Sequence, residues 1–153
     1  MDKIKQKIQE GWIHCIFIIE MLGKPKEHLE KTLKGYINAL KKDKKIETLK
    51  EEYAEAEKDK DSELYTIFVE LEVLVKGAAK VVDFCFDYLP SSIEIIEPKS
   101  VEHQSQDFSA LLNDLQARIH QMDMTVKNSN QENVVLKKNS AIFLKNIIYL
   151  SLR

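Results

Sequence analysis

The 153-residue sequence has little cysteine, glycine or proline: two, four and three residues respectively. Cys15 and Cys85 lie in apolar stretches far apart in the chain, whereas a disulfide framework or a zinc site needs more thiols or closer spacing. We therefore expect two free thiols in a reducing cytoplasm. With 44% hydrophobic and 31% charged residues, the composition indicates a well-ordered globular protein rather than a disordered or fibrous one.

An excess of charge of one sign is also absent, since the formal net charge is −2. Domains that bind nucleic acid usually carry a basic excess that neutralises phosphates. We expect no nucleic-acid partner.

Long apolar runs are missing as well. The run from Trp12 to Leu22 is well short of the roughly 20 residues that span a bilayer, and no small-residue cleavage motif follows it. The C-terminal "SAIFLKNIIYLSLR" is apolar but has few cations, so membrane docking through it is the lesser alternative to a protein contact. We expect neither a signal peptide nor a membrane span, and a cytoplasmic location.

Four stretches have the sequence pattern of β-strands. "WIHCIFIIEML" and "LYTIFVELEVLVKG" are rich in β-branched and aromatic residues and alternate with a period of two. The Glu- and Lys-rich stretch 46–57 predicts an edge strand, and "SSIEIIEPKS" predicts a short fourth strand closed by Pro98.

Two stretches between these strands carry a helical period, "KEHLEKTLKGYINALKKD" and "AAKVVDFCFDYLP". The resulting order is β-α-β-β-α-β, which predicts a ferredoxin-like α+β domain over residues 1–98. In that arrangement both helices cover one face of an antiparallel sheet, and the first and third strands are central.

A linker at 99–107 precedes a predicted helical extension at 108–153, where apolar residues recur every three or four positions in a coiled-coil-like register. The Asn-rich "KNSNQENVVLKKNS" leaves two alternatives open, a helical hairpin that turns there or a single long helix. The predicted interface residues are Phe108, Leu112, Leu115, Ile119, Met122, Val126, Leu136, Phe143, Ile147 and Leu150.

His14 and Cys15 resemble a base beside its nucleophile, but neighbouring side chains of a strand point to opposite faces. The face opposite the helices carries several carboxylates and an imidazole, groups suited to a metal, to a polar or cationic ligand, or to acid–base chemistry. The sequence does not specify which metal, and solvated surface charges are the alternative. The candidate ligand residues are His14, Glu20, Glu70, Glu72 and Glu94.

Two further observations concern this face. Phe68 alone is placed to stack on a base, which disfavours an RNA-binding surface. Ile16 and Ile18 share the face, so we expect the C-terminal helices or a second subunit to cover part of it.

The sequence contains no glycine-rich phosphate loop, GxSxG, HExxH or CxxC motif, so we expect no cofactor. Our leading hypothesis is a non-enzymatic assembly or regulatory module that acts through protein–protein contacts and forms a homodimer. The alternative is a small metal- or ligand-binding protein, or an enzyme, that uses the acidic face of the sheet.

Overall fold

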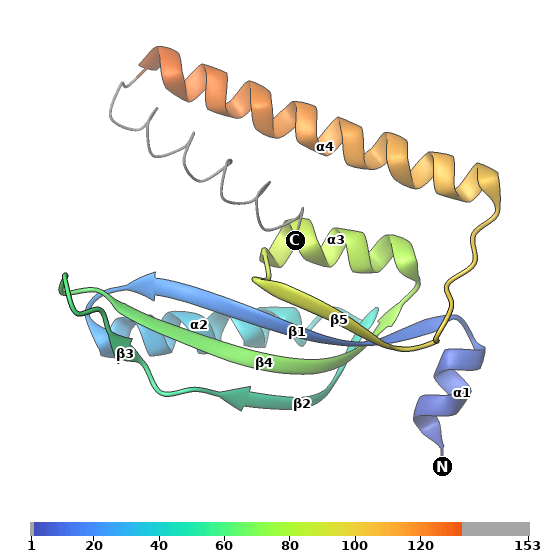
Figure 1. The fold of residues 1–153 in the computed structure, drawn as a ribbon, viewed down its shortest axis with the longest axis horizontal. Coiled ribbons are helices and arrows are strands. Elements are labelled where there is room, and N and C mark those ends of the chain that lie inside the picture. The colour runs from blue at the N-terminus through green and yellow to red at the C-terminus, as the bar shows by residue number, and fades with distance from the viewer. Residues whose placement is uncertain (1, 133–153) are drawn as a thin grey trace. The chain divides into compact units, whose positions relative to one another are not determined.

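The computed structural model describes residues 2–132 of the chain, which divides into two units, Met1–Val101 and Glu102–Arg153. The first unit is an α+β structure with an antiparallel sheet, as the sequence predicts (Figure 1). Its elements are α1 (Lys3–Gln9), β1 (Trp12–Gly23), α2 (Lys26–Leu40), β2 (Ile46–Tyr53), β3 (Glu57–Lys58), β4 (Tyr65–Lys76), α3 (Ala78–Tyr88) and β5 (Ser92–Glu97).

The strands follow the order β2-β4-β1-β5, and every pairing is antiparallel. The two longest strands, β1 and β4, are central and pair along their whole lengths. The charged strand β2 and the short strand β5 form the two edges. Both edges contain an irregularity, at Thr48–Lys50 in β2 and opposite His14–Cys15 in β5.

The predicted edge strand 46–57 is shorter in the structure, and a fifth strand was not foreseen. The β2 ladder ends at Tyr53, although the amide of Ala54 still donates a hydrogen bond to the carbonyl of Phe68. The chain then pairs again as β3, opposite Thr66 and Tyr65. The stretch 46–57 is rich in Glu and Lys throughout, so no alternation in the sequence revealed the break between β2 and β3.

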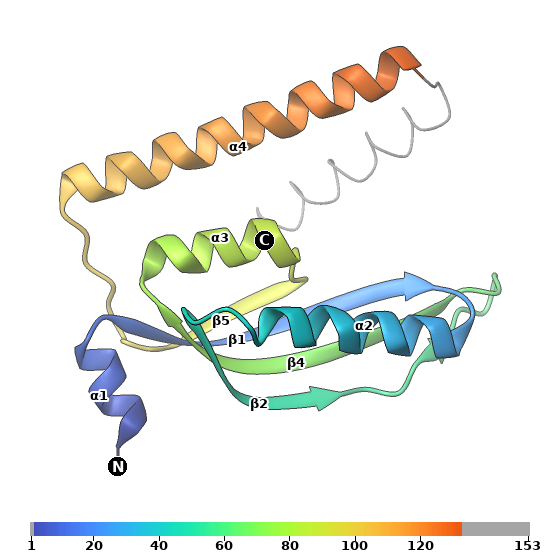
Figure 2. The same cartoon turned by 180° about the vertical axis from the view of Figure 1, so that it is seen from behind.

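The core lies between one face of the sheet and the two helices α2 and α3, which Figure 2 shows from behind. The odd-numbered residues of β1 and β4 point into it, as alternation requires. Phe17 of β1 stacks on Phe84 of α3 with ring centroids 3.9 Å apart. The buried stripe of α2 consists of Leu29, Leu33, Ile37 and Leu40.

The turn from β4 into α3 depends on Gly77, whose φ of +94° lies in a region that side chains with a Cβ rarely adopt. Because of this turn, α3 follows the central strand directly and packs back on the sheet. Phe84 is thereby placed against Phe17.

Helix α1 was not predicted. Ile4 and Ile8 are both half-buried and lie one helical turn apart, so the seven-residue helix has a small apolar side. The helix contacts β1. The mixed charge of the first eleven residues concealed this short pattern.

In the second unit the structure describes one helix, α4 (Ser105–Glu132). It begins before Phe108 and continues through Lys127 into the Asn-rich stretch, so no turn occurs up to Glu132. The predicted contacts Leu136, Phe143, Ile147 and Leu150 lie outside the described residues. No helix within residues 2–132 is long and apolar enough to cross a membrane.

Candidate functional site: the open face of the sheet

The face of the sheet opposite α2 and α3, which we call the open face, carries the even-numbered residues of β1 and β4. Its register is set by the antiparallel pairing of these strands, which places Ile16 opposite Glu72, Ile18 opposite Glu70 and Glu20 opposite Phe68. Ile16 and Ile18 are half-buried, and Phe68 is 41% exposed. The open face is therefore an apolar strip lined with carboxylates.

Helix α1 covers one end of this face. The ammonium group of Lys7 lies 4.1 Å from the ring centroid of Trp12 and forms an ion pair with Glu47 of β2. Leu74, which belongs to the same face, is only 1% exposed. Helix α1, which was not foreseen, thus covers the end near Trp12, whereas the expected cover by the C-terminal helices or a second subunit stays a prediction.

His14 lies in this covered region and is 9% exposed. Its Nε2 is 3.4 Å from Oε1 of Glu72, close enough for charge attraction but without the alignment of a hydrogen bond. Within the described residues, Nε2 of His14 and Oγ1 of Thr48 are buried without a hydrogen-bond partner. A buried imidazole nitrogen in this state has unused capacity to form a hydrogen bond with a polar group.

The open face carries a strong excess of negative charge. Lys50 of β2 lies 2.7 Å from Glu52, and this hydrogen bond, followed by the attraction of Glu72 and Glu70, raises the pKa of Lys50. The basic residues that the register places on this face are Lys50 and Lys76. The acidic residues are Glu20, Glu47, Glu52, Glu57, Glu70, Glu72, Glu94 and Glu97.

The structure brings some of the predicted ligand residues together and separates others. Glu72 and Glu94 lie on the two strands that flank Ile16, and Glu72 also approaches His14. Glu70 lies one open-face position further along β4, and Glu20 lies opposite Phe68, beyond Ile18. Within residues 2–132, no three His, Cys, Asp or Glu side chains are close enough together to hold a metal ion. The predicted ligand site therefore stays a prediction.

The predicted separation of His14 from Cys15 is confirmed. Cys15 is fully buried in the core, and burial, followed by the nearby Cys85, raises the pKa of its thiol to about 12. At neutral pH such a thiol is protonated and a poor nucleophile. No catalytic dyad forms, because His14 is on the opposite face.

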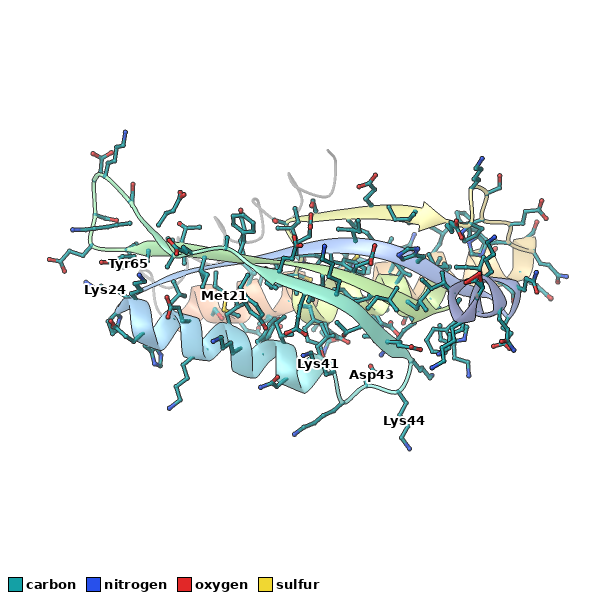
Figure 3. The ribbon with its side chains drawn as sticks, turned by 90° about the horizontal axis from the view of Figure 1, so that it is seen from below. Met21, Lys24, Lys41, Asp43, Lys44 and Tyr65 are labelled. Atoms are coloured by element: carbon teal, nitrogen blue, oxygen red, sulfur yellow. The ribbon has the colours of Figure 1, made fainter. Side chains whose placement is uncertain are left out.

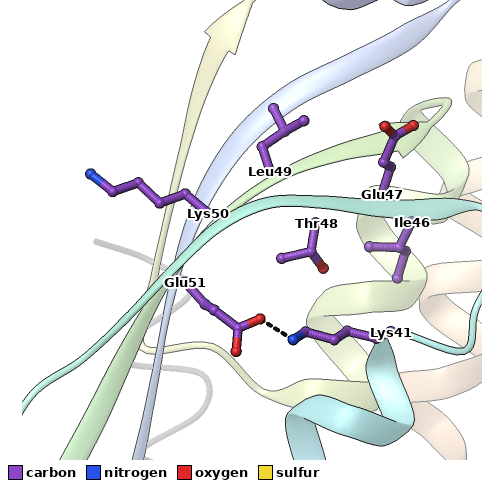
Figure 4. A pocket seen from close by; sticks show the side chains of 7 residues that line it. All are labelled: Lys41, Ile46, Glu47, Thr48, Leu49, Lys50 and Glu51. Atoms are coloured by element: carbon purple, nitrogen blue, oxygen red, sulfur yellow. Dashed lines mark ion pairs between the residues drawn. The ribbon is translucent and has the colours of Figure 1, made fainter.

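A second feature, not foreseen from the sequence, is a hollow of about 490 Å³ beside β2, shown in Figure 4. Lys41 forms an ion pair with Glu51 across it, and the unpartnered Thr48 hydroxyl lies on its wall. The sequence signal for this hollow was Thr48, a polar residue on the core-facing side of an edge strand. Such a residue is too common to predict a hollow.

The polar residues at the two ends of α2 are shown in Figure 3, with Lys24 near its start and Lys41, Asp43 and Lys44 near its end. Oδ2 of Asp43 is 2.5 Å from Nζ of Lys80 on α3, and this hydrogen bond lowers the pKa of the Asp43 carboxyl. The loop after α2 is thereby held to α3. The ion pairs Lys41–Glu51 and Lys80–Asp43 thus connect α2 and the loop after it to β2 and α3.

The fold and the open face define a small α+β protein with an acidic, partly apolar sheet surface. A family model matches residues 14–142, and the chain belongs to this family, the MJ0538 family. The match extends over residues of both units. Comparisons with curated proteins and with solved structures each found no match.

Proposed function

We propose that the protein is a non-enzymatic assembly or regulatory module that forms homodimers, with the apolar side of α4 as the principal contact. The observation that carries this proposal is the exposure of large apolar side chains on one side of α4. Phe108, Leu112 and Ile119 are 46%, 42% and 49% exposed and fall in the register of four and three that places them along one line of the helix.

The continuation of this apolar stripe along α4 supports a protein contact. Leu115, Met122 and Val126 continue the stripe and are half-buried in the structure. Exposed apolar side chains that form a contiguous patch are typical of a protein interaction site.

The finer description of the architecture is part of the same proposal. We infer a ferredoxin-like first unit, which the strand order β2-β4-β1-β5 and the core between the sheet, α2 and α3 support. We also infer that α4 belongs to a coiled-coil-like extension, which the register from Phe108 to Val126 supports. A cytoplasmic location is consistent with the free thiols of Cys15 and Cys85.

Sedimentation equilibrium of the full chain tests the proposal. We expect a dimer at micromolar concentration and a dissociation constant at least 10-fold weaker after Leu112→Glu/Ile119→Glu, because each change places a charge in an apolar contact. Ala117→Glu/Gln121→Glu is the matched control, since both residues are exposed on the same helix outside the register. A full chain that stays monomeric at micromolar concentration contradicts the proposal.

A further inference from the structure

We propose that the open face of the sheet is the docking surface for residues 133–153 of a second copy of this chain. The inference deepens the proposed assembly function and rests on it, because two copies must meet for the contact to form. It assigns a role to the face that the core does not use and names the segment that occupies it.

The first argument is that part of this face needs a cover that the first unit does not supply. Helix α1 reaches the end near Trp12 and Leu74, whereas Phe68 and Leu22 on the same face are 41% and 63% exposed. Ile16 and Ile18 lie between these two regions and are half-buried. A sheet face with this apolar content is typical of a surface that packs against another element.

The second argument is charge complementarity. Carboxylates line the apolar strip on both sides, with Glu72 and Glu94 flanking Ile16 and with Glu70 opposite Ile18. An occupant must therefore be apolar and cationic to be attracted rather than repelled. The raised pKa of Lys50 reports the same negative surroundings.

The third argument is that the chain contains one segment with this chemistry. Residues 133–153, "NVVLKKNSAIFLKNIIYLSLR", include no Asp or Glu. Their charged residues are Lys137, Lys138, Lys145 and Arg153, set among Ile, Leu, Val and Phe. A segment of this length can extend over at most about 70 Å, well beyond the roughly 40 Å that a 12-residue strand such as β1 spans.

When a second copy supplies this segment, the assembly is a closed dimer. If each copy places its segment on the other's sheet, the same contact forms twice around a two-fold axis and no acidic face is left over. The apolar stripe of α4 then remains available for the contact proposed above. The two contacts use different residues and can be separated by mutation.

Two charge-reversed full-length proteins test the docking. The face variant is Glu70→Lys/Glu72→Lys, and the segment variant is Lys137→Glu/Lys138→Glu/Lys145→Glu. Each alone places like charges in both copies of the contact, so we expect at least 10-fold weaker dimerisation by sedimentation equilibrium. An equimolar mixture restores opposite charges in both contacts, so we expect a heterodimer within about 3-fold of the original affinity.

Controls distinguish this contact from others. Glu27→Lys/Glu63→Lys reverses two charges, as the face variant does, but both lie outside the open face. We expect it to leave dimerisation unchanged. Circular dichroism and thermal melting of each variant check that it is folded. A mixture whose heterodimer is no tighter than the homodimer of either variant overturns the inference and is the result expected if the segment docks on its own chain.

Other outcomes separate the inference from the proposed function. If both charge variants dimerise as tightly as the original chain, the docking is wrong while the α4 contact stands. If Leu112→Glu/Ile119→Glu leaves the dimer intact and the charge variants behave as expected, the α4 contact is wrong while the docking stands. A monomeric full chain overturns both.

Discussion

Adjacent residues of β1 occupy different chemical surroundings. Cys15 is fully buried in the core, whereas His14 lies on the open face, 3.4 Å from Glu72. The period of two in the sequence was sufficient to predict this separation, because it depends only on the geometry of a single strand.

The raised pKa of Cys15 leads to a prediction about stability at high pH. The thiol has an ordinary pKa of 9.0 and a folded-state pKa of about 12. Between these values the unfolded chain loses the proton while the folded chain keeps it, so the free energy of unfolding falls as pH rises and is unaffected below pH 9. The Cys15 contribution amounts to roughly 1 kcal/mol between pH 7 and pH 10.

Urea unfolding of the original chain and of Cys15→Ala over this pH range checks the prediction. The variant retains the lysines and tyrosines whose own titration affects both proteins, so the difference between the two slopes isolates Cys15. The prediction is contradicted if the free energy of unfolding changes with pH by the same amount in both proteins.

At the scale of elements, the strength of the periodic pattern decided what could be predicted. β1 and β4 extend over twelve residues each, β1 with imperfect and β4 with clear alternation, and both were located from the sequence. α1 has seven residues and β3 has two, which is too short for a period to stand out among charged neighbours. The break between β2 and β3 follows from pairing with β4, a long-range contact that no local pattern encodes.

Helix α1 gives a prediction at this scale. Ile4 and Ile8 are half-buried where the helix meets the sheet, whereas Lys3 and Lys5 are exposed. Ile4→Ser/Ile8→Ser is expected to lower the free energy of unfolding by about 1–3 kcal/mol, since each change removes a partly buried apolar side chain. Lys3→Ser/Lys5→Ser should change it by less than about 0.5 kcal/mol.

Chemical denaturation measures both pairs of variants. An Ile variant as stable as the Lys variant would show that α1 does not cover the sheet in solution.

At the scale of the whole molecule, the chain divides into two units, and the first contains the entire sheet and its core. We expect a fragment of residues 1–101 to fold alone, with a cooperative thermal transition close to that of the corresponding unit in the full chain. Differential scanning calorimetry of both proteins measures this. A fragment without a cooperative transition would show that the sheet depends on residues after 101.

The candidate site was predictable in composition but not in geometry. Alternation placed His14, Glu70 and Glu72 on one face, and this is the arrangement in the structure. That Glu72 and Glu94 flank Ile16 depends on the register of β1 with two other strands, which the sequence does not state. The closeness of Glu72 to His14 depends in addition on side-chain conformation.

The alternation of β1 and β4 also bears on how a protein of this kind can change over evolutionary time. Odd-numbered positions of these strands contribute to the core, and even-numbered positions of the same strands form the open face. Substitutions at the two sets of positions can accumulate almost independently, since they share a backbone but few side-chain neighbours. A lineage can therefore change the chemistry of the open face through the even-numbered residues while it inherits the same folded framework.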